Sequence, residues 1–192
     1  EDMCEAASLV NNLFMVNLVM NADMKLSYIF SGHYLTSWER ACTAVDDIYR
    51  VDIPCRADAV VTSCGGFPKT IDNVESALKP GGTLVLMIEA PEGGGPAEYF
   101  DWSKNLQDGS IEQRLREAFT VAGYIFFLNC EQAQRYRIFM YSSIDPQTVA
   151  PMGIHAFSDM DALLKAAELD GKSTYIIPNG STVIPRVKGE TL

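Results

Sequence analysis

The sequence has few of the residues that build redox or metal sites. Its five cysteines are scattered through 192 residues and form no CxxC pair. This usage argues against a disulfide scaffold or a zinc site and favours free thiols in a reducing cytoplasm. The two histidines, His33 and His155, have no further ligands at metal-binding spacing. Cys64 has no histidine nearby in the sequence that would activate it as a nucleophile.

Positive charge is scarce as well. The chain has 15 lysines and arginines against 25 aspartates and glutamates, which gives a formal net charge of −10. No basic stripe is present, which argues against nucleic acids and anionic membranes as partners. The apolar runs end well short of the ~20 residues that span a membrane, and no signal peptide is visible. Because the chain begins with Glu1 in place of methionine, we expect a piece of a longer, cytoplasmic protein.

What the sequence does contain is a strand–helix–strand pattern over residues 57–90. Residues 59–62 and 83–88 are short apolar runs rich in β-branched residues, typical of strands buried on both faces. Between them we expect a glycine turn and a helix that Pro80-Gly81-Gly82 ends. Such a unit predicts a parallel sheet with right-handed crossovers. Ligands of these sheets bind at the carboxyl ends of the strands.

Residues 1–56 predict a different arrangement. We expect a helix over 1–12, a β-hairpin of strands 14–20 and 26–30, and a helix over 35–49. Asn21 and Asp23 are typical of a hairpin turn. Five residues recur at helical spacing on one face of the second helix: Trp38, Ala41, Cys42, Val45 and Ile48. We place a domain boundary between residues 56 and 57.

Strands and helices alternate through the rest of the chain. We expect helices over 99–106, 111–119, 123–134 and 159–169, and strands over 137–142 and 173–177. His155 falls in a predicted loop. The expected fold class is α/β, with a mostly parallel sheet and βαβ crossovers over 57–192. An N-terminal helix–β-hairpin–helix segment over 1–56 precedes it.

Two glycine-rich loops follow predicted strands at the ends where ligands bind. Their candidate residues are Gly65, Gly66, Phe67 and Pro68 in the first loop, and Gly93 and Gly94 in the second. We expect both loops to face a common hollow at one edge of the sheet. The second loop fits equally well as an anion-binding nest of backbone N–H groups and as a flexible loop over a cleft. Tyr124 is a candidate for the cleft wall or for packing on the sheet.

The Lys79–Gly82 turn before an apolar strand resembles the late part of class I methyltransferases that use S-adenosylmethionine. Those enzymes also need a glycine-rich loop after their first strand. Upstream of residue 57 the chain has only the single glycine of Ser31-Gly32-His33. The turn is therefore better interpreted as a helix stop before a strand.

A second resemblance covers nearly the whole chain. Six segments carry it, in this order: EDM at 1–3, residues 14–30 followed by SGH, ADAVV at 57–61, GGFPK at 65–69, KPGGT at 79–83 and IPNG at 177–180. Together they resemble the C-terminal half of the nickel-dependent lactate racemase family (LarA-like proteins). The glycine-glycine-aromatic-proline turn is the most specific of them.

This resemblance implies an enzyme with two domains and an active site between them. The family uses a nickel pincer nucleotide, tethered through a lysine, to move a hydride off and back onto the α-carbon of a 2-hydroxy acid. The tether, the histidine ligand of nickel and the acid–base histidines belong to the N-terminal half. We therefore expect this chain to be inactive alone, to bind no cofactor by itself, and to have its missing N-terminal domain as partner, with residues 1–56 as a remnant of that domain.

The chain departs from the family where the C-terminal half contributes a Tyr-Gln pair and a lysine. Aligned without gaps from Pro68, those positions hold Val74, Glu75 and Leu78. Lys79 stands one residue later, a rotation of about 100° on a helix. Glu75 and Lys79 remain the catalytic candidates, and an acidic Glu75 would repel a carboxylate substrate. We therefore expect a substrate other than lactate.

Two alternatives stay open. The first is a non-catalytic α/β module that binds a small anion or a protein, which the loss of the Tyr-Gln and lysine positions favours. The second is a methyltransferase, disfavoured by the missing cofactor loop. The hairpin over 14–30 also presents edges through which the chain is able to self-associate.

Overall fold

The structure is a computed structural model that describes residues 2–63, 74–90 and 97–190. The chain divides into two units, Glu1–Val51 and Asp52–Leu192. This division falls close to the boundary expected after residue 56. The assignment of residues 1–56 to a preceding domain stays a prediction.

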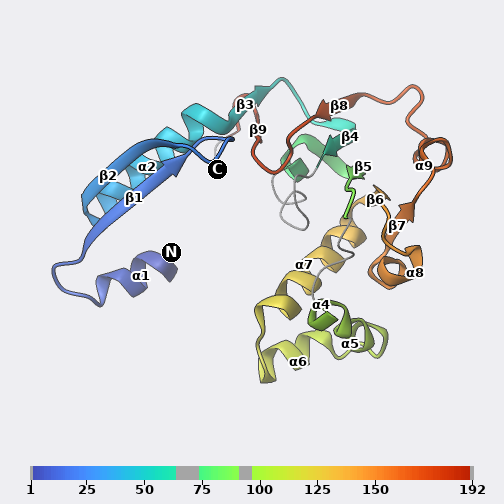
Figure 1. Cartoon of the computed structure of the whole chain (residues 1–192), viewed down its shortest axis with the longest axis horizontal. Coiled ribbons are helices and arrows are strands. Elements are labelled where there is room, and N and C mark those ends of the chain that lie inside the picture. Colours follow the sequence, from blue (N-terminus) through green and yellow to red (C-terminus); the bar gives the residue numbers. More distant parts are fainter. Residues whose placement is uncertain (1, 64–73, 91–96, 191–192) are drawn as a thin grey trace. The chain divides into compact units, whose positions relative to one another are not determined.

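The first unit is a β-hairpin with a helix along one face (Figure 1). Its elements are α1 (Asp2–Ser8), β1 (Phe14–Met20), β2 (Leu26–His33) and α2 (Tyr34–Tyr49). The strands pair antiparallel, which confirms the predicted hairpin. The Asn21 side chain holds the turn, because its Oδ1 accepts hydrogen bonds from the backbone N–H groups of Asp23 at 3.0 Å and Lys25 at 2.9 Å.

The core of the first unit is small. Val19, Ala41 and Ala44 are buried, and three larger residues pack around them: Phe30, Val45 and Ile48. The predicted apolar face of α2 is correct for Ala41, Val45 and Ile48, which belong to this core, but wrong for Trp38 and Cys42, which are exposed. The face toward the hairpin also includes the small residues Ser37 and Ala44, which the apolar pattern did not mark.

The second unit is built on a five-stranded parallel sheet, which confirms the predicted α/β fold class. Its strands are β4 (Ala57–Ser63), β5 (Leu78–Met87), β6 (Arg137–Tyr141), β7 (Ile154–Phe157) and β8 (Thr174–Ile177). They lie in the order β7-β6-β5-β4-β8, and each neighbouring pair is parallel. Two short strands, β3 (Arg50–Ile53) and β9 (Ile184–Val187), pair in a separate sheet.

Helices make most of the connections in this unit. They are η1 (Glu75–Ala77), α4 (Ala97–Asp101), α5 (Ser103–Gln107), α6 (Ile111–Glu117), α7 (Val121–Arg135), α8 (Pro146–Val149), η2 (Ala150–Met152) and α9 (Met160–Ala167). Side chains cap several of them; for example, Asp159 accepts a hydrogen bond from the Ala162 N–H at 2.8 Å. Within the described ranges, none of the helices has both the length and the apolar character that crossing a bilayer requires.

The two faces of the sheet belong to different cores. Leu84 and Leu86 of β5 join the larger core with Phe126 of α7, and all three are fully buried. Val85 points to the other face, as the alternation along a strand requires. There it packs in a smaller core with Leu163 of α9. Both faces are covered, which explains why β4 and β5 are continuous apolar runs.

Two predictions about local structure are wrong. Residues 79–82 belong to β5 and do not end a helix. Ala57 pairs with Leu78 but Ala59 pairs with Thr83, so β5 carries extra residues that bulge out of the ladder. Gly81 supplies the positive φ of +73° that this bulge uses. Proline and glycine mark a bulge and a helix end alike, so the sequence did not separate the two.

His155 also lies on a strand, β7, and not in the predicted loop. β7 is only four residues long and forms one edge of the sheet. Short edge strands carry little apolar periodicity, and the pattern was therefore missed. The strand β9 was missed for the same reason.

Candidate functional site

The order of the strands marks one place on the sheet as a ligand site. From β4 the chain passes to β5, β6 and β7 on one side, and β8 then returns to the other side of β4. At such a reversal the loops after the two central strands diverge and leave a crevice at the carboxyl ends. The candidate site is therefore the carboxyl edge at β4 and β8, which we call the switch-point edge. It comprises Thr62, Ser63 and residues 177–182.

Two hydrogen bonds hold the switch-point edge together. The hydroxyl of Thr62 donates to the carbonyl oxygen of Ile177 at 2.9 Å, and the backbone N–H of Gly180 donates to the carbonyl oxygen of Ser63 at 3.0 Å. Thr62 is buried, so its hydroxyl requires such a partner. The loop after β8 is thus fixed against the end of β4, while the side chains of Ser63 and Asn179 stay exposed.

The neighbouring strands β5 and β6 are tied in a similar way. The hydroxyl of Ser143, just after β6, donates to the carbonyl oxygen of Glu89 at 2.7 Å and lies 3.2 Å from that of Ala90. Ala90 has a φ of +46°, a left-handed conformation that costs energy for a residue with a Cβ. The contacts of Ser143 therefore support a strained turn where the chain leaves the end of β5.

Both predicted glycine loops lie outside the described residues. This applies to Gly65, Gly66, Phe67 and Pro68, and to Gly93 and Gly94. The residues before the two loops are described: Ser63 at the end of β4 pairs with Met87 at the end of β5. The chain thus enters both loops from adjacent parallel strands at the same edge. That the loops face one hollow stays a prediction.

Lys79 lies at the start of β5, at the opposite edge of the sheet. Its Nζ forms an ion pair of 2.7 Å with Oδ1 of Asp58, and the Ser173 hydroxyl donates to the other carboxylate oxygen at 2.6 Å. The hydrogen bond from Lys79, followed by those from Ser173, holds the pKa of Asp58 well below its usual range. The hydrogen bond that Lys79 donates to Asp58 likewise raises the pKa of Lys79. In this arrangement the ammonium group ties β5 to β4, and its role as a catalytic candidate stays a prediction.

Glu75 lies in η1, which leads into the start of β5. Its neighbour Ser76 donates a hydrogen bond to the carbonyl oxygen of Pro185 in β9 at 2.7 Å. Burial, followed by the negative charge of Glu75, raises the pKa of Tyr136. Both catalytic candidates thus come before or at the start of β5, whereas the glycine loops follow β4 and β5.

Tyr124 lies in the first turn of α7, within a group of helices formed by α4–α7. Its ring centroid is 5.8 Å from that of Phe119, and both side chains are exposed. The next residue toward the N-terminus, Gly123, contacts Trp102 closely: a Cβ there would lie 2.3 Å from the indole ring. The missing side chain lets the buried Trp102 pack on α7. A cleft-wall role for Tyr124 stays a prediction.

The titratable groups inside the second unit are held neutral. Asn129 donates a hydrogen bond of 2.7 Å to the hydroxyl of Tyr99, and burial raises the pKa of Tyr99 well above its usual value. Burial also raises the pKa of the adjacent Cys130 to about 12. A thiol with this pKa is not a nucleophile at neutral pH. These groups are part of the core and supply no reactive centre.

The described residues do not fit a metal site. Within 2–63, 74–90 and 97–190, no three histidine, cysteine, aspartate or glutamate side chains come close enough to hold an ion. The ring of His33 lies 4.6 Å from that of Tyr34, and the ring of His155 lies 5.4 Å from that of Phe139. Each histidine is thus in aromatic contact, at the end of β2 and on β7.

Comparison with known proteins shows what this chain is similar to. No family model matches the chain. It is 27% identical over 205 residues to the lactate racemase of Thermoanaerobacterium thermosaccharolyticum, an alignment that covers 97% of the chain. The solved structure of that lactate racemase apoprotein has a TM-score of 0.81 and covers 96% of the chain. The chain resembles lactate racemase.

Further relatives agree with this lactate racemase-like assignment and confirm the predicted resemblance. The lactate racemase of Lactiplantibacillus plantarum is 24% identical over 207 residues, or 96% of the chain. A Thermotoga maritima protein of known structure, with a TM-score of 0.52 and 17% identity over 91% of the chain, supports the fold alone. The lactate racemase-like chain spans about half the length of the curated relatives, 48% and 47%.

Sequence reasoning missed Ser143 and the linking role of Thr62. Both act through hydrogen bonds to the backbone of a strand or loop far away in the sequence, which leaves no local pattern. Asn179-Gly180 was recognisable as a turn after a strand, but its bond to Ser63 depends on β8 lying beside β4.

Proposed function

We propose that this chain supplies the α/β half of a nickel-pincer-nucleotide-dependent racemase or epimerase of 2-hydroxy acids. The observation that carries the proposal is the similarity to lactate racemase over 97% of the chain, together with the TM-score of 0.81 to the solved apoprotein. Because the chain spans about half of these relatives, the activity belongs to a longer parent protein that also contains the other half.

The metal and its tether are assigned to that other half. The described residues do not fit a nickel site, since they bring no three suitable ligands together. The chemistry of the metal is therefore assigned to the other half and not to these residues. This chain contributes the switch-point edge, where the exposed side chains of Ser63 and Asn179 form part of one wall of the proposed substrate cleft. Alone, the chain is inactive.

The substrate is a 2-hydroxy acid other than lactate, or an uncharged hydroxyl compound. This rests on the positions of the family's Tyr-Gln pair and lysine, which hold Val74, Glu75 and Leu78 here. The alignment alone places the negative charge of Glu75 at a small carboxylate substrate, because in the described chain Glu75 comes before β5, at the edge opposite the switch-point edge. No amide or ammonium group offsets that charge at these three positions. The same positions support a non-catalytic binding module as the alternative.

We also propose that the parent protein acts in the cytoplasm. The composition supports this, since five scattered cysteines fit a reducing compartment. In the described part of the chain, Cys4, Cys42, Cys55 and Cys130 are free thiols.

The test uses the parent protein matured with the nickel pincer nucleotide. Enantiopure 2-hydroxy acids, including lactate, are incubated with it, and racemisation is followed by chiral chromatography. We expect turnover of an acid other than lactate, and none with the 192-residue chain alone. A parent protein that retains no cofactor would contradict the assignment as an enzyme and would favour the alternative, a non-catalytic binding module. Efficient turnover of lactate would contradict only the substrate assignment.

A variant sharpens the substrate assignment. Replacing Glu75 with Gln removes the repulsion of a carboxylate, and we expect kcat/KM for lactate to rise on the order of tenfold. Glu98→Gln, an exposed glutamate of α4, is the control and should leave kcat/KM unchanged. Equal values for both variants would show that Glu75 does not act on the substrate.

A further inference from the structure

The hairpin of the first unit has an apolar face that the described chain leaves open. Directly opposed residues of an antiparallel pair point to the same side, so Leu18 and Ile29 lie side by side on this face. Phe14 and Val16 continue it along β1. The four residues are 68% (Phe14), 57% (Val16), 61% (Leu18) and 59% (Ile29) exposed. We call these four residues the outer face of the hairpin.

The inner face of the same hairpin is covered. Val19 is buried, and Phe30 packs with it against α2. Asn17 on this side donates a hydrogen bond of 3.0 Å to the hydroxyl of Ser37 in α2. One helix thus covers one face, while the opposite face of alternating apolar residues has no layer among the described residues. A two-stranded hairpin with one covered face is marginally stable in water.

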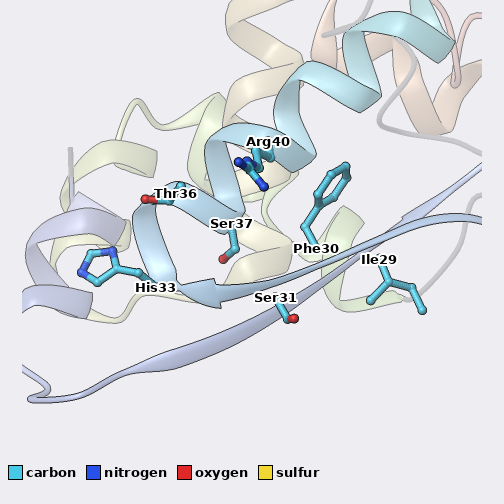
Figure 2. A pocket seen from close by; sticks show the side chains of 7 residues that line it. All are labelled: Ile29, Phe30, Ser31, His33, Thr36, Ser37 and Arg40. Carbon is cyan, nitrogen blue, oxygen red and sulfur yellow. The ribbon is translucent and has the colours of Figure 1, made fainter.

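A hollow of about 310 Å³ runs along the free edge of β2. Ile29 and Ser31 line it from the outer face and Phe30 from the inner face, so it follows the backbone at the strand's edge. Thr36 and Arg40 of α2 line its other side, and Figure 2 shows them on the helix that runs beside β2. Two further residues complete the lining: His33 and Ser37.

β2 is also an open edge for backbone pairing. Among the described residues the sheet contains only β1 and β2, so one side of the eight-residue β2 has no partner strand. The strand contains neither proline nor lysine, the residues that commonly protect exposed edges. Such an edge, with an apolar face above it and a hollow beside it, accepts an extended segment as a third strand.

We propose that an extended apolar segment from the other half of the parent protein pairs with the free edge of β2 and that this half covers the outer face of the hairpin. This interface rests on the proposed function, because it takes the occupant from the longer parent. The lactate racemases are about twice as long as this chain, and their alignments cover 97% and 96% of it. Almost all of the chain, the hairpin included, thus has a counterpart in proteins that contain a further half. The segment carries an acidic side chain for Arg40, which faces the hollow.

The first measurement compares hydrogen exchange of the 192-residue chain with that of the parent protein. In the chain alone, the amides of β2 on the free edge exchange rapidly; in the parent we expect them to slow by at least tenfold. Equal exchange in both proteins would overturn strand pairing. The readout does not depend on racemase activity, so a parent without activity but with a protected β2 would contradict the proposed function and leave this interface intact.

The second measurement uses matched variants of the parent. Val16→Lys places a charge on the outer face, and Val121→Lys places the same charge on α7 at a comparable exposure, 57% against 65% in this chain. In the parent protein, we expect Val16→Lys to raise the hydrogen-exchange rate of the β2 amides by at least tenfold. Val121→Lys should leave that rate unchanged. In the 192-residue chain neither variant should alter the fold. Unchanged protection in Val16→Lys would overturn coverage of the outer face.

A second copy of the chain is the competing occupant. Light scattering of the 192-residue chain, with and without Leu18→Lys, separates the two. We expect a monomer in both cases, with β2 protected only in the parent. A dimer that Leu18→Lys dissociates, with β2 already protected in that dimer, would assign the outer face to self-association and overturn the proposal.

Discussion

The two units of this chain bury their apolar residues to very different extents. In the second unit, Leu86 and Phe126 are fully buried, and both faces of the parallel sheet have a core. Among the described residues of the first unit, the buried apolar side chains are those of Val19, Ala41 and Ala44, and the apolar side chains of the outer face are more than half exposed. One unit closes its own core, whereas the other covers one face of a hairpin and leaves the second open.

This difference indicates which unit folds by its own interactions. Burial of apolar surface is the main favourable term in folding, and a unit of about 50 residues that leaves one apolar face of its hairpin exposed is only marginally stable. The first unit is therefore the one that a further layer, as proposed above, would stabilise most. The following changes would break or sharpen that contrast.

The largest effect is expected from a core deletion in the second unit. Phe126→Ala removes a fully buried ring from α7, and we expect it to lower the free energy of unfolding by about 3–5 kcal/mol. Leu18→Ala, on the outer face of the hairpin, should change it by no more than about 0.5 kcal/mol, because that side chain is exposed. Urea unfolding followed by circular dichroism measures both. Similar losses in the two variants would mean that the 192-residue chain already covers the outer face.

The features that were predictable from the sequence are those that depend on neighbouring residues. The apolar runs of β4 and β5 predicted a buried parallel sheet, and Asn21 predicted the hairpin turn that its side chain holds. The bulge at Gly81 was misread because it depends on how β5 pairs with β4. Trp38 was misplaced because helical spacing does not tell how far an apolar face stays covered: Ala41 and Ile48 of the same face do pack against the hairpin.

A smaller but specific loss is expected where α7 contacts Trp102. Gly123→Ala adds a Cβ that would lie 2.3 Å from the indole, which costs about 1–3 kcal/mol; the better helix propensity of alanine returns about 1 kcal/mol. We therefore expect a net loss of up to about 2 kcal/mol and a red shift of tryptophan fluorescence. Combining it with Trp102→Phe should cost less than the sum of the two variants. Full additivity would contradict the contact.

Hydrogen bonds at the carboxyl edge come next in size. Ser143→Ala removes the hydroxyl that donates to Glu89, and we expect a loss of about 1 kcal/mol, with faster hydrogen exchange near the end of β5. Ser158→Ala, an exposed serine after β7, is the control and should stay within about 0.5 kcal/mol of the original chain. Equal effects would show that Ser143 does not support the strained turn at Ala90.

The candidate site was predictable only in outline. Strand order at a switch point follows from the βαβ pattern together with a return strand, and the carboxyl edge was expected on that ground. The residues that tie this edge, Thr62 and Ser143, bond to backbone 115 and 54 positions away. No short motif records such a pair. Lys79 was singled out by alignment, yet its ion pair with Asp58 depends on the bulge that the sequence concealed.

The smallest effect is expected at that ion pair, and it depends on pH. The pKa of Asp58 is lowered in the folded chain, so the carboxylate adds stability above its unfolded pKa of about 3.9 and loses that contribution as pH falls toward the folded value. We expect Asp58→Asn to lower Tm at pH 7 by about 2 °C, since exposed ion pairs contribute little. Below about pH 4 the difference should shrink steadily. Asp101→Asn, exposed in α4, is the control and should show no such trend. A Tm difference for Asp58→Asn that persists at low pH would mean that the packing of the aspartate, and not its charge, ties β4 to β5. The amino edge of the sheet in the second unit would then be held by packing and not by this ion pair.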